Sequence, residues 1–226
     1  MTKLHSLRLT LCLALLSTLL QSCHSSHESH EVPASPARVL IIGDSISIGY
    51  FEPTKALLGE KADVYHNPGN AQHTAHGLAQ LDAWLGETPW DVIHFNHGLH
   101  DLKYADERGR LVTVTEGKQQ IPIDEYARNL EALTVRLKQT GAALIFATTT
   151  PVPEGARGRV KGDEVHYNKV AREIMTRHKV PVNDLYSFAL ARLDAIQQPK
   201  NVHFTEEGSQ QLAEQVARHI GLAIEK

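Results

Sequence analysis

From residue 38 onward, short apolar runs alternate with amphipathic stretches, and this alternation limits the fold more than any other feature of the chain. The first run, 38–42, is rich in β-branched residues and ends at Gly43, as a buried parallel strand does. Similar runs predict strands at 62–66, 90–95, 142–148 and 180–183. Apolar residues at spacings of three and four predict helices at 75–85, 123–138, 163–178, 185–196 and 206–223. The pattern predicts an α/β protein with a five-stranded parallel sheet between two layers of helices, a three-layer α/β/α sandwich.

One long polar segment, 103–121, interrupts this pattern. Val112, Val114 and Ile121 alternate partially within it, which predicts a hairpin. No other insertion is long enough to act as a lid or a substrate-binding flap, so we expect this segment to border a site.

The N-terminus has the features of a targeting segment. A basic start is followed by the apolar run 9–20, which is too short to span a bilayer as a helix. The sequence 20–23, Leu-Gln-Ser-Cys, resembles a bacterial lipobox, in which the cysteine is lipidated. We expect a lipoprotein signal peptide at 1–22, a lipid anchor on Cys23, a flexible tether at 23–37 and a domain at 38–226. The protein would then lie at the bacterial cell envelope, periplasm-facing or on the cell surface. The alternative is an ordinary secretory signal with a cleavage site nearby.

Cysteine and charge exclude several classes of protein. Cys12 would leave with the signal, so the mature chain would hold Cys23 alone, without a disulfide, a catalytic thiol or a cysteine-based zinc site. His24, His27 and His30 read better as part of a solvated tether than as a loose metal site. A net charge of -3 with scattered Lys and Arg predicts no nucleic-acid partner.

Polar residues stand directly after the predicted strands. They occupy the segments 43–47, 67–72 and 96–101, and a further segment, 201–205, precedes the last helix. Ligands of doubly wound sheets bind at the carboxyl ends of the strands. The four segments are therefore expected to converge on one site.

Three of these segments resemble the sequence blocks of the SGNH (GDSL) hydrolases. Gly43-Asp44-Ser45 resembles the first block, 98–101 (Gly-Leu-His-Asp) resembles the Gly-x-Asn-Asp block, and His203 before Phe-Thr-x-x-Gly resembles the last block. The blocks occur in the family's order, and the match extends from residue 38 to the final helix. The resemblance implies the flavodoxin-like SGNH fold and ester hydrolysis without a metal or another cofactor.

The resemblance also implies the roles of individual residues. Ser45 would be the nucleophile and His203 its general base, a pairing suited to neutral pH. The oxyanion donors would be the Ser45 backbone, a glycine after the second strand and the asparagine of the third block, each worth about 3 kcal/mol. As alternatives, Asp44 and Ser45 could simply cap a helix, and His203 could cap the last helix, although Thr205 suits that role better.

Two blocks depart from the family pattern in their oxyanion donors. His100 replaces the family asparagine; a neutral imidazole still donates one N–H, although His100 could instead be a second acid–base group. In the second block, alignment on Asn67 puts Gln72 at the expected glycine, whereas Gly69 lies nearer the strand. A backbone N–H of Gly69 or Gln72, or the side chain of Asn70 or Gln72, would serve.

The last block lacks the aspartate that usually orients the histidine. Lys200 stands three residues before His203, where the family has Asp. A backbone carbonyl could orient His203, or Asp184 at the end of the fifth strand could supply the carboxylate. For Asp184 we favour a role as N-cap of the helix starting at Leu185.

The histidines of the third strand do not predict a metal site. His94, His97 and His100 are spaced in threes. Successive residues of a strand point to opposite faces, so the side chains of His94 and His97 would diverge. We expect no metal.

The sequence therefore predicts a serine ester hydrolase that forms an acyl-enzyme on Ser45, with a small acyl ester or an acylated glycan as its substrate. Amides and imidazoles crowd the strand ends, which favours a hydrophilic ester such as an O-acetylated carbohydrate: Asn67, Asn70, Gln72, Asn96 and His97. The alternatives are an O-acyltransferase on the same fold and an inactive binding lipoprotein. The presence of both Ser45 and His203 argues against the second. Contact with the membrane would be through the lipid anchor alone.

Overall fold

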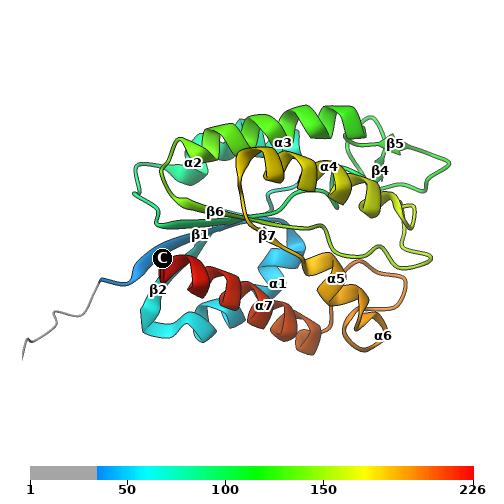
Figure 1. The fold of residues 1–226 in the computed structure, drawn as a ribbon. Helices are drawn as coiled ribbons and strands as arrows, with labels where there is room; N and C mark the ends of the chain where they lie inside the picture. The colour runs from blue at the N-terminus through cyan, green and yellow to red at the C-terminus, as the bar shows by residue number, and fades with distance from the viewer. Residues whose placement is uncertain (1–34) are drawn as a thin grey trace, which may run out of the picture. The chain divides into compact units, whose positions relative to one another are not determined.

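The computed structural model describes residues 35–226, and within them the predicted parallel sheet is confirmed (Figure 1). Its five strands lie in the order β2-β1-β3-β6-β7, and every neighbouring pair is parallel. The strands are β1 (Ala37–Ile42), β2 (Ala62–His66), β3 (Val92–Phe95), β6 (Ala143–Ala147) and β7 (Val182–Asn183). The predicted signal peptide at 1–22, the lipidation site Cys23 and the tether histidines lie outside the described residues. β1 begins at Ala37, one residue before the predicted run 38–42.

Helices cover both faces of the sheet and complete the predicted three-layer sandwich (Figure 1). One layer consists of α2 (Thr74–Leu85), α3 (Ile123–Lys138) and α4 (Asp163–His178). The other consists of α1 (Ser45–Leu58), α5 (Leu185–Leu190), α6 (Leu193–Ile196) and α7 (Glu206–Ile224). A short 3-10 turn, Gly59–Lys61, leads from α1 into β2. Within residues 35–226, none of the helices is both long and apolar enough to cross a membrane.

The strand order creates a crevice at the carboxyl ends of β1 and β3. From β1 the chain first moves to β2 on one side and then crosses to β3 on the other, so both strands pair with β1. Val39 shows this directly, because it pairs with Val64 of β2 and Val92 of β3. This change of direction is the topological switch point at which open α/β sheets bind ligands.

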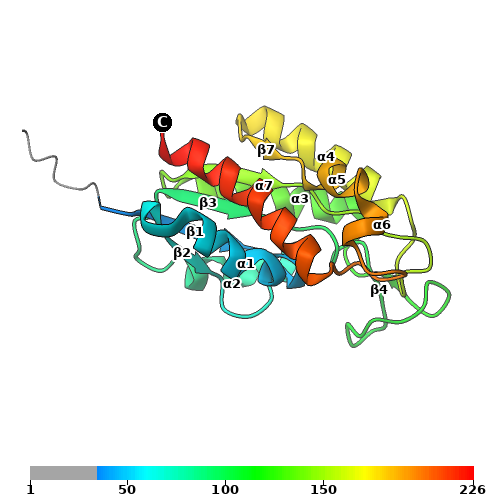
Figure 2. The same ribbon diagram turned by 90° about the horizontal axis from the view of Figure 1, so that it is seen from below.

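Helix α1 was not among the predicted helices, and its sequence explains why. Gly49 and Pro53 lie inside it, and both residues disfavour a helix interior. Packing against α7 compensates for them, since the two helices run side by side (Figure 2). A Cβ atom on Gly49 would lie 3.1 Å from Ser209 Oγ of α7, so the glycine permits this close approach.

The polar insertion forms the predicted hairpin. β4 (Tyr104–Ala105) pairs antiparallel with β5 (Lys118–Gln119). The Tyr104 N–H donates to the Gly158 carbonyl at 2.7 Å, which ties the base of the hairpin to the loop after β6. We call residues 104–119 the flap.

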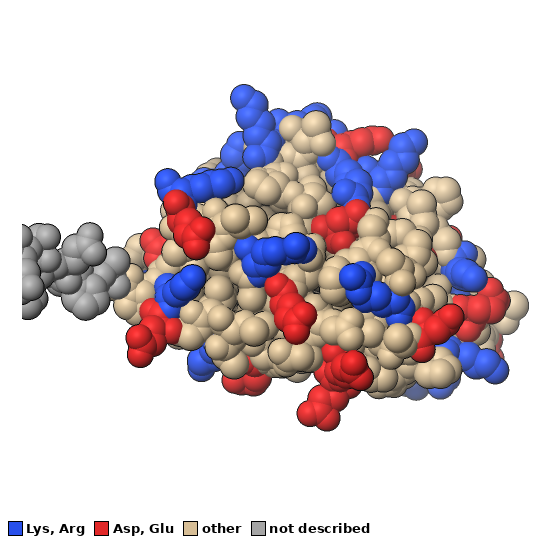
Figure 3. Space-filling model, turned by 60° about the horizontal axis from the view of Figure 1, so that its bottom comes forward, with Lys and Arg blue, Asp and Glu red and all other residues tan. Residues whose placement is uncertain are grey.

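Acidic and basic side chains are interspersed on the face of the molecule shown in Figure 3. No single-sign patch dominates this face, in keeping with the formal net charge of -3 for the whole chain.

Candidate active site

A tight turn between β1 and α1 places Ser45 at the crevice. The buried Asp44 carboxylate caps α1 by accepting the Ile46 N–H at 2.9 Å. The Gly43 N–H donates to Asn67 Oδ1 at 2.8 Å, and a Cβ on Gly43 would lie 2.6 Å from Ser47 Oγ. Of Asp44 and Ser45, which the sequence suggested as an alternative helix cap, only Asp44 caps the helix. The Ser45 hydroxyl is available to another partner.

That partner is His203. Ser45 Oγ lies 2.9 Å from His203 Nε2, across 158 residues of sequence. Ser45 is half-buried and His203 is exposed, so the pair faces solvent. His203 does not cap α7, because Thr205 does so by accepting the Gly208 N–H at 3.0 Å. The distance suits proton transfer from the hydroxyl to the imidazole.

The group that orients His203 is the side chain of Asn201. Asn201 Oδ1 lies 2.8 Å from His203 Nδ1 and also accepts the His203 backbone N–H at 3.1 Å. Asn201 Nδ2 donates to Gln198 Oε1 at 3.0 Å, and Gln198 Nε2 donates to the Phe204 carbonyl at 3.0 Å. Because backbone N–H groups only donate and carbonyls only accept, these bonds fix which end of each amide faces its neighbour. His203 Nδ1 must then carry the proton, and Nε2 is left as an acceptor for Ser45.

Asp184 has a different role from the orienter considered above. Its carboxylate binds Arg172 Nη2 at 2.6 Å and accepts the Ser187 N–H at 3.2 Å as the N-cap of α5. The favoured capping interpretation is therefore correct. Sequence reasoning missed Asn201, because the expected carboxylate lies three residues before the histidine and Asn201 lies two before it. No backbone carbonyl of residues 35–226, the other orienter considered, contacts His203 Nδ1 either.

His100, the residue in the family asparagine position, is a neutral imidazole. Burial, reinforced by the charges of Lys103 and Arg159, lowers the pKa of His100 to about 3. Lys103 Nζ lies 3.4 Å from His100 Nδ1. Since an ammonium group only donates, Nδ1 accepts and the single ring proton lies on Nε2. His100 therefore keeps one N–H donor, and it is not a second acid–base group near neutral pH.

The second block forms a compact turn with two free donors. Gly69 and Gln72 both adopt left-handed backbone conformations, with φ of 67° and 53°. The Gln72 N–H is used by Asn70 Oδ1 at 2.8 Å, and the Ala71 N–H by the Gly43 carbonyl at 2.9 Å. The backbone N–H groups of Gly69 and Asn70 have no hydrogen-bond acceptor among residues 35–226. Of the two predicted backbone donors, the N–H of Gly69 can therefore bind an oxyanion, whereas that of Gln72 cannot. The backbone N–H of Asn70, which was not predicted, is a further candidate donor.

The buried histidines near the site diverge as predicted. His94 contacts Asn183 at 3.2 Å on the α7 side of the sheet, whereas His97 Nδ1 lies 3.2 Å from the Gln72 carbonyl on the α2 side. Among residues 35–226, no three His, Cys, Asp or Glu side chains are arranged to hold a metal ion.

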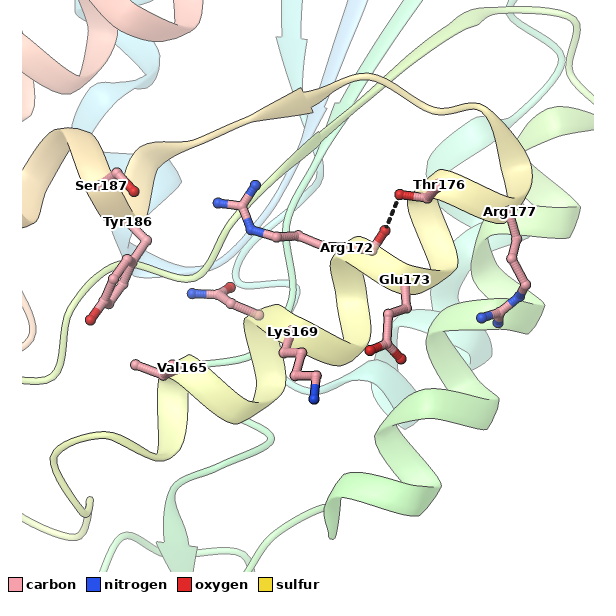
Figure 4. A pocket seen from close by; sticks show the side chains of 9 residues that line it. Val165, Lys169, Arg172, Glu173, Thr176, Arg177, Tyr186 and Ser187 are labelled. Atoms are coloured by element: carbon pink, nitrogen blue, oxygen red, sulfur yellow. Dashed lines mark hydrogen bonds between the residues drawn. The ribbon is translucent and has the colours of Figure 1, made fainter.

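An open cavity of about 740 Å³ lies between α4 and α5 (Figure 4), and Ser45 does not line it. Lys169, Arg172 and Glu173 of α4 line it, with Tyr186 and Ser187 of α5 on the other side. None of its lining residues follows a strand of the β1–β3 crevice, and Arg172 is bound to Asp184. A second cavity, of about 1010 Å³, lies between His73 and the flap.

The fold and the polar site at the β1–β3 crevice are those of an α/β hydrolytic enzyme, and a match to a sequence family defines the class further. Residues 41–211, which include Ser45, His100 and His203, match the GDSL-like Lipase/Acylhydrolase family. The protein is thus a carboxylic ester hydrolase with a three-layer α/β/α fold. The chain belongs to the GDSL-like lipase/acylhydrolase family, which confirms the resemblance to SGNH hydrolases.

Solved structures of esterases share the fold. The acetyl xylan esterase AlAXEase is 16% identical, with a TM-score of 0.67 over 81% of this chain and 99% of that protein. A lipase/acylhydrolase from Enterococcus faecalis is 21% identical, with the same TM-score over 81% and 95%. Axe2, an acetylxylan esterase from Geobacillus stearothermophilus, is 17% identical, with a TM-score of 0.67 over 83% and 96%. At these identities the likeness shows a common fold. No curated protein matches the sequence.

Proposed function

We propose that the protein hydrolyses small acyl esters through a covalent acyl-enzyme on Ser45. The observation that carries this proposal is the 2.9 Å contact between Ser45 Oγ and His203 Nε2, with Nε2 held as an acceptor by Asn201. A serine hydroxyl is a weak nucleophile until a base within hydrogen-bond distance accepts its proton.

In the proposed reaction, Ser45 Oγ bonds to the ester carbonyl carbon while its proton moves to His203 Nε2. The resulting oxyanion is stabilised by the Ser45 N–H, by the free N–H groups of Gly69 or Asn70, and by His100 Nε2–H. The bond to the alcohol oxygen then breaks, and His203 protonates the departing alcohol. Water attacks the acyl-enzyme with His203 as its base, and release of the acid restores the Ser45 hydroxyl.

A neutral amide in place of the carboxylate changes the energetics of this reaction. Replacing the carboxylate by an amide is most harmful in serine hydrolases when the amide presents its NH₂ group and stabilises the wrong histidine tautomer. Here Asn201 presents its oxygen, so the tautomer is the productive one. What the site lacks is the negative charge that would stabilise the imidazolium. We expect a functional but slower enzyme.

We propose a small acyl group, such as acetyl, on a hydrophilic alcohol. The cavity behind the first turn of α1, lined in part by Ile46, Ser47 and Leu99, measures about 10 Å³, which holds no more than one water. A long acyl chain has no room there. The half-buried side chains of Asn70 and Gln72 suit a sugar hydroxyl, and two of the structures with this fold are acetylxylan esterases. An O-acetylated carbohydrate is therefore the substrate class we propose.

Hydrolysis is favoured over the two alternatives. The exposure of His203 gives water access to the acyl-enzyme, which an O-acyltransferase has to prevent. The Ser45–His203 contact and the fixed tautomer would have no purpose in a binding lipoprotein without catalysis.

The test compares p-nitrophenyl acetate turnover and fluorophosphonate labelling in the wild type, Ser45→Ala and Ser209→Ala. Loss of both signals in Ser45→Ala alone is the expected result. Ser209 on α7 is a matched control, because its hydroxyl faces Gly49 of α1 and not the Ser45–His203 pair. Equal rates for Ser45→Ala and the wild type would exclude Ser45 as the nucleophile.

We further propose that the protein is anchored to the bacterial envelope by a lipid on Cys23. The lipobox-like sequence 20–23 after the apolar run 9–20 supports this. Cys23→Ser should move the protein from the membrane fraction to the soluble fraction. A wild-type protein that is already soluble in its native host would refute the anchor.

A further inference from the structure

Two basic side chains are attached to the third sequence block. Arg159 Nε donates to the Leu99 carbonyl at 3.1 Å, and Lys103 Nζ contacts His100 Nδ1 at 3.4 Å. Both side chains are half-buried. The two cations therefore lie beside the residue that we propose as an oxyanion donor.

Among residues 35–226, neither cation forms a close ion pair with a carboxylate, although the Asp44 side chain favours the charged form of Arg159 from beyond 4.0 Å. Within residues 35–226, no Asp or Glu oxygen lies within 4.0 Å of Lys103 Nζ or the Arg159 guanidinium, although six other Lys and Arg residues form such pairs. The carboxylates of this region are Asp44 and Asp101; both are buried and accept hydrogen bonds from N–H groups of Ile46 and Thr74. Burial lowers the pKa of Lys103 and of Arg159, which means that their positive charges are incompletely solvated. A bound anion would compensate for this cost.

The backbone around both residues is held firmly. Gly158, directly before Arg159, has a φ of 62° and accepts the Tyr104 N–H at 2.7 Å. A Cβ on Gly158 would lie 2.4 Å from the Val112 carbonyl, so the flap packs directly on this loop. The Lys103 carbonyl accepts the Gln120 N–H at 2.8 Å. Cations on a fixed backbone bind an anion at a lower cost in conformational entropy than mobile ones.

We propose that Lys103 and Arg159 bind a carboxylate carried by the alcohol part of the substrate, so that the preferred ester is an acylated acidic sugar of the uronic acid type. This inference rests on the proposed function. With Nε bound to Leu99, the two Nη nitrogens of Arg159 keep their donors, and this pair matches the two oxygens of a carboxylate. The acetyl group of the proposed substrate carries no charge. The negative charge must therefore lie on the alcohol.

The experiment compares two matched substrates, the methyl glycosides of O-acetylglucuronic acid and of O-acetylglucose, acetylated at the same position. For the wild type we expect kcat/KM to be roughly 10- to 100-fold higher for the glucuronide, the usual effect of a charge-assisted hydrogen bond. Arg159→Gln and Lys103→Met should each reduce this ratio toward one. Arg157→Gln is the matched control: it removes the same charge from an exposed position of the same loop, and it should keep the ratio.

A second measurement does not depend on the variants. Methyl glucuronide should inhibit p-nitrophenyl acetate hydrolysis by the wild type more strongly than methyl glucoside, and salt should weaken this difference. Equal inhibition, or equal kcat/KM for the two acetylated sugars, overturns the carboxylate site and leaves the esterase proposal intact. Turnover of p-nitrophenyl acetate that persists in Ser45→Ala overturns the proposed function instead.

Discussion

At the scale of single residues, the unusual feature of the site is a chain of neutral groups where a charged one is expected. Hydrogen bonds link four side chains one after another: Ser45, His203, Asn201 and Gln198. The Gln198 amide in turn donates to the Phe204 backbone carbonyl. Each group in this chain has a defined donor and acceptor end, so the direction of every bond is set by the backbone groups at Phe204 and His203.

Replacing Asn201 tests this chain of hydrogen bonds. Asn201→Leu removes the acceptor for His203 Nδ1–H, so we expect kcat to fall about 10²- to 10⁴-fold with little change in KM, as when an orienting residue is lost. Asn201→Asp keeps the acceptor and adds the missing charge, so its kcat should equal or exceed that of the wild type. Steady-state assays with p-nitrophenyl acetate measure kcat and KM for both variants. A wild-type kcat in Asn201→Leu would show that His203 needs no orienter.

His100 provides a second test at this scale. His100→Ala removes the proposed Nε2–H donor, and kcat should fall about 10²- to 10³-fold, the cost of one oxyanion donor. His100→Asn restores the family side chain, and its amide should keep kcat within a few-fold of the wild type. If the alanine and asparagine variants are equally slow, His100 is not a donor that an amide can replace.

Part of this site could be predicted from the sequence, and part could not. Ser45 and His203 lie in recognisable blocks at predictable ends of secondary structure. The role of Asn201 depends on a local turn in which Lys200 has a φ of 56°. This left-handed conformation is uncommon for lysine, and the sequence contains no motif that predicts it. The proton position on His100 depends on Lys103, three residues away on an irregular segment.

At the scale of secondary structure elements, hydrophobic periodicity predicts helices and strands correctly where burial of an apolar face is what stabilises them. α3 and α4 begin and end where their patterns predict, because each has an uninterrupted apolar face. α1 was missed because its stability depends on α7, and the predicted helix at 185–196 is interrupted at residues 191–192 between α5 and α6. Such tertiary effects override local patterns.

Asp101 joins the loop after β3 to the start of α2, and it makes stability depend on pH. Its Oδ1 accepts the Thr74 N–H at 2.8 Å and the Thr74 hydroxyl at 2.6 Å, whereas burial raises its pKa from 3.8 to about 7. Between about pH 4 and pH 7 the unfolded chain has lost this proton and the native state keeps it. The contribution of Asp101 to the free energy of unfolding is therefore full below pH 4 and declines by about 1.4 kcal/mol per pH unit up to pH 7.

Asp101→Asn removes this dependence, because the amide oxygen can still accept from Thr74 but has no proton to lose. Urea denaturation at pH 4.5 and at pH 7 should show that the variant gains stability relative to the wild type at the higher pH. A buried group that does not act on Asp101, such as His97, titrates in both proteins and cancels in the comparison. The same difference between variant and wild type at both pH values would mean that the native Asp101 is ionised throughout.

At the scale of the whole molecule, the parts described so far surround one face. The turn after β1 provides Ser45, the loop before α7 provides His203, and the loop after β6 provides Arg159. The flap and His73 line one cavity. Between the flap and His73 lies the cavity of about 1010 Å³, large enough for sugar units beyond the acetylated one. Under the proposed function, the flap is a candidate binding surface for the rest of a glycan, because Ser45 does not line this cavity.

Shortening the flap tests whether glycan binding can be changed without changing hydrolysis of the ester. The turn 106–110 is held by its own bonds, in which Asp106 Oδ1 accepts the N–H groups of Arg108 and Arg110, and Ala105 pairs with Leu111 across its base. A two-residue Asn-Gly turn can replace it, because this dipeptide favours tight hairpins. We expect KM for an acetylated oligosaccharide to rise several-fold, since one wall of the cavity is lost, while turnover of p-nitrophenyl acetate stays at the wild-type level. Equal losses for both substrates would mean that the turn supports the catalytic site itself, and unchanged constants for both would mean that the glycan binds elsewhere.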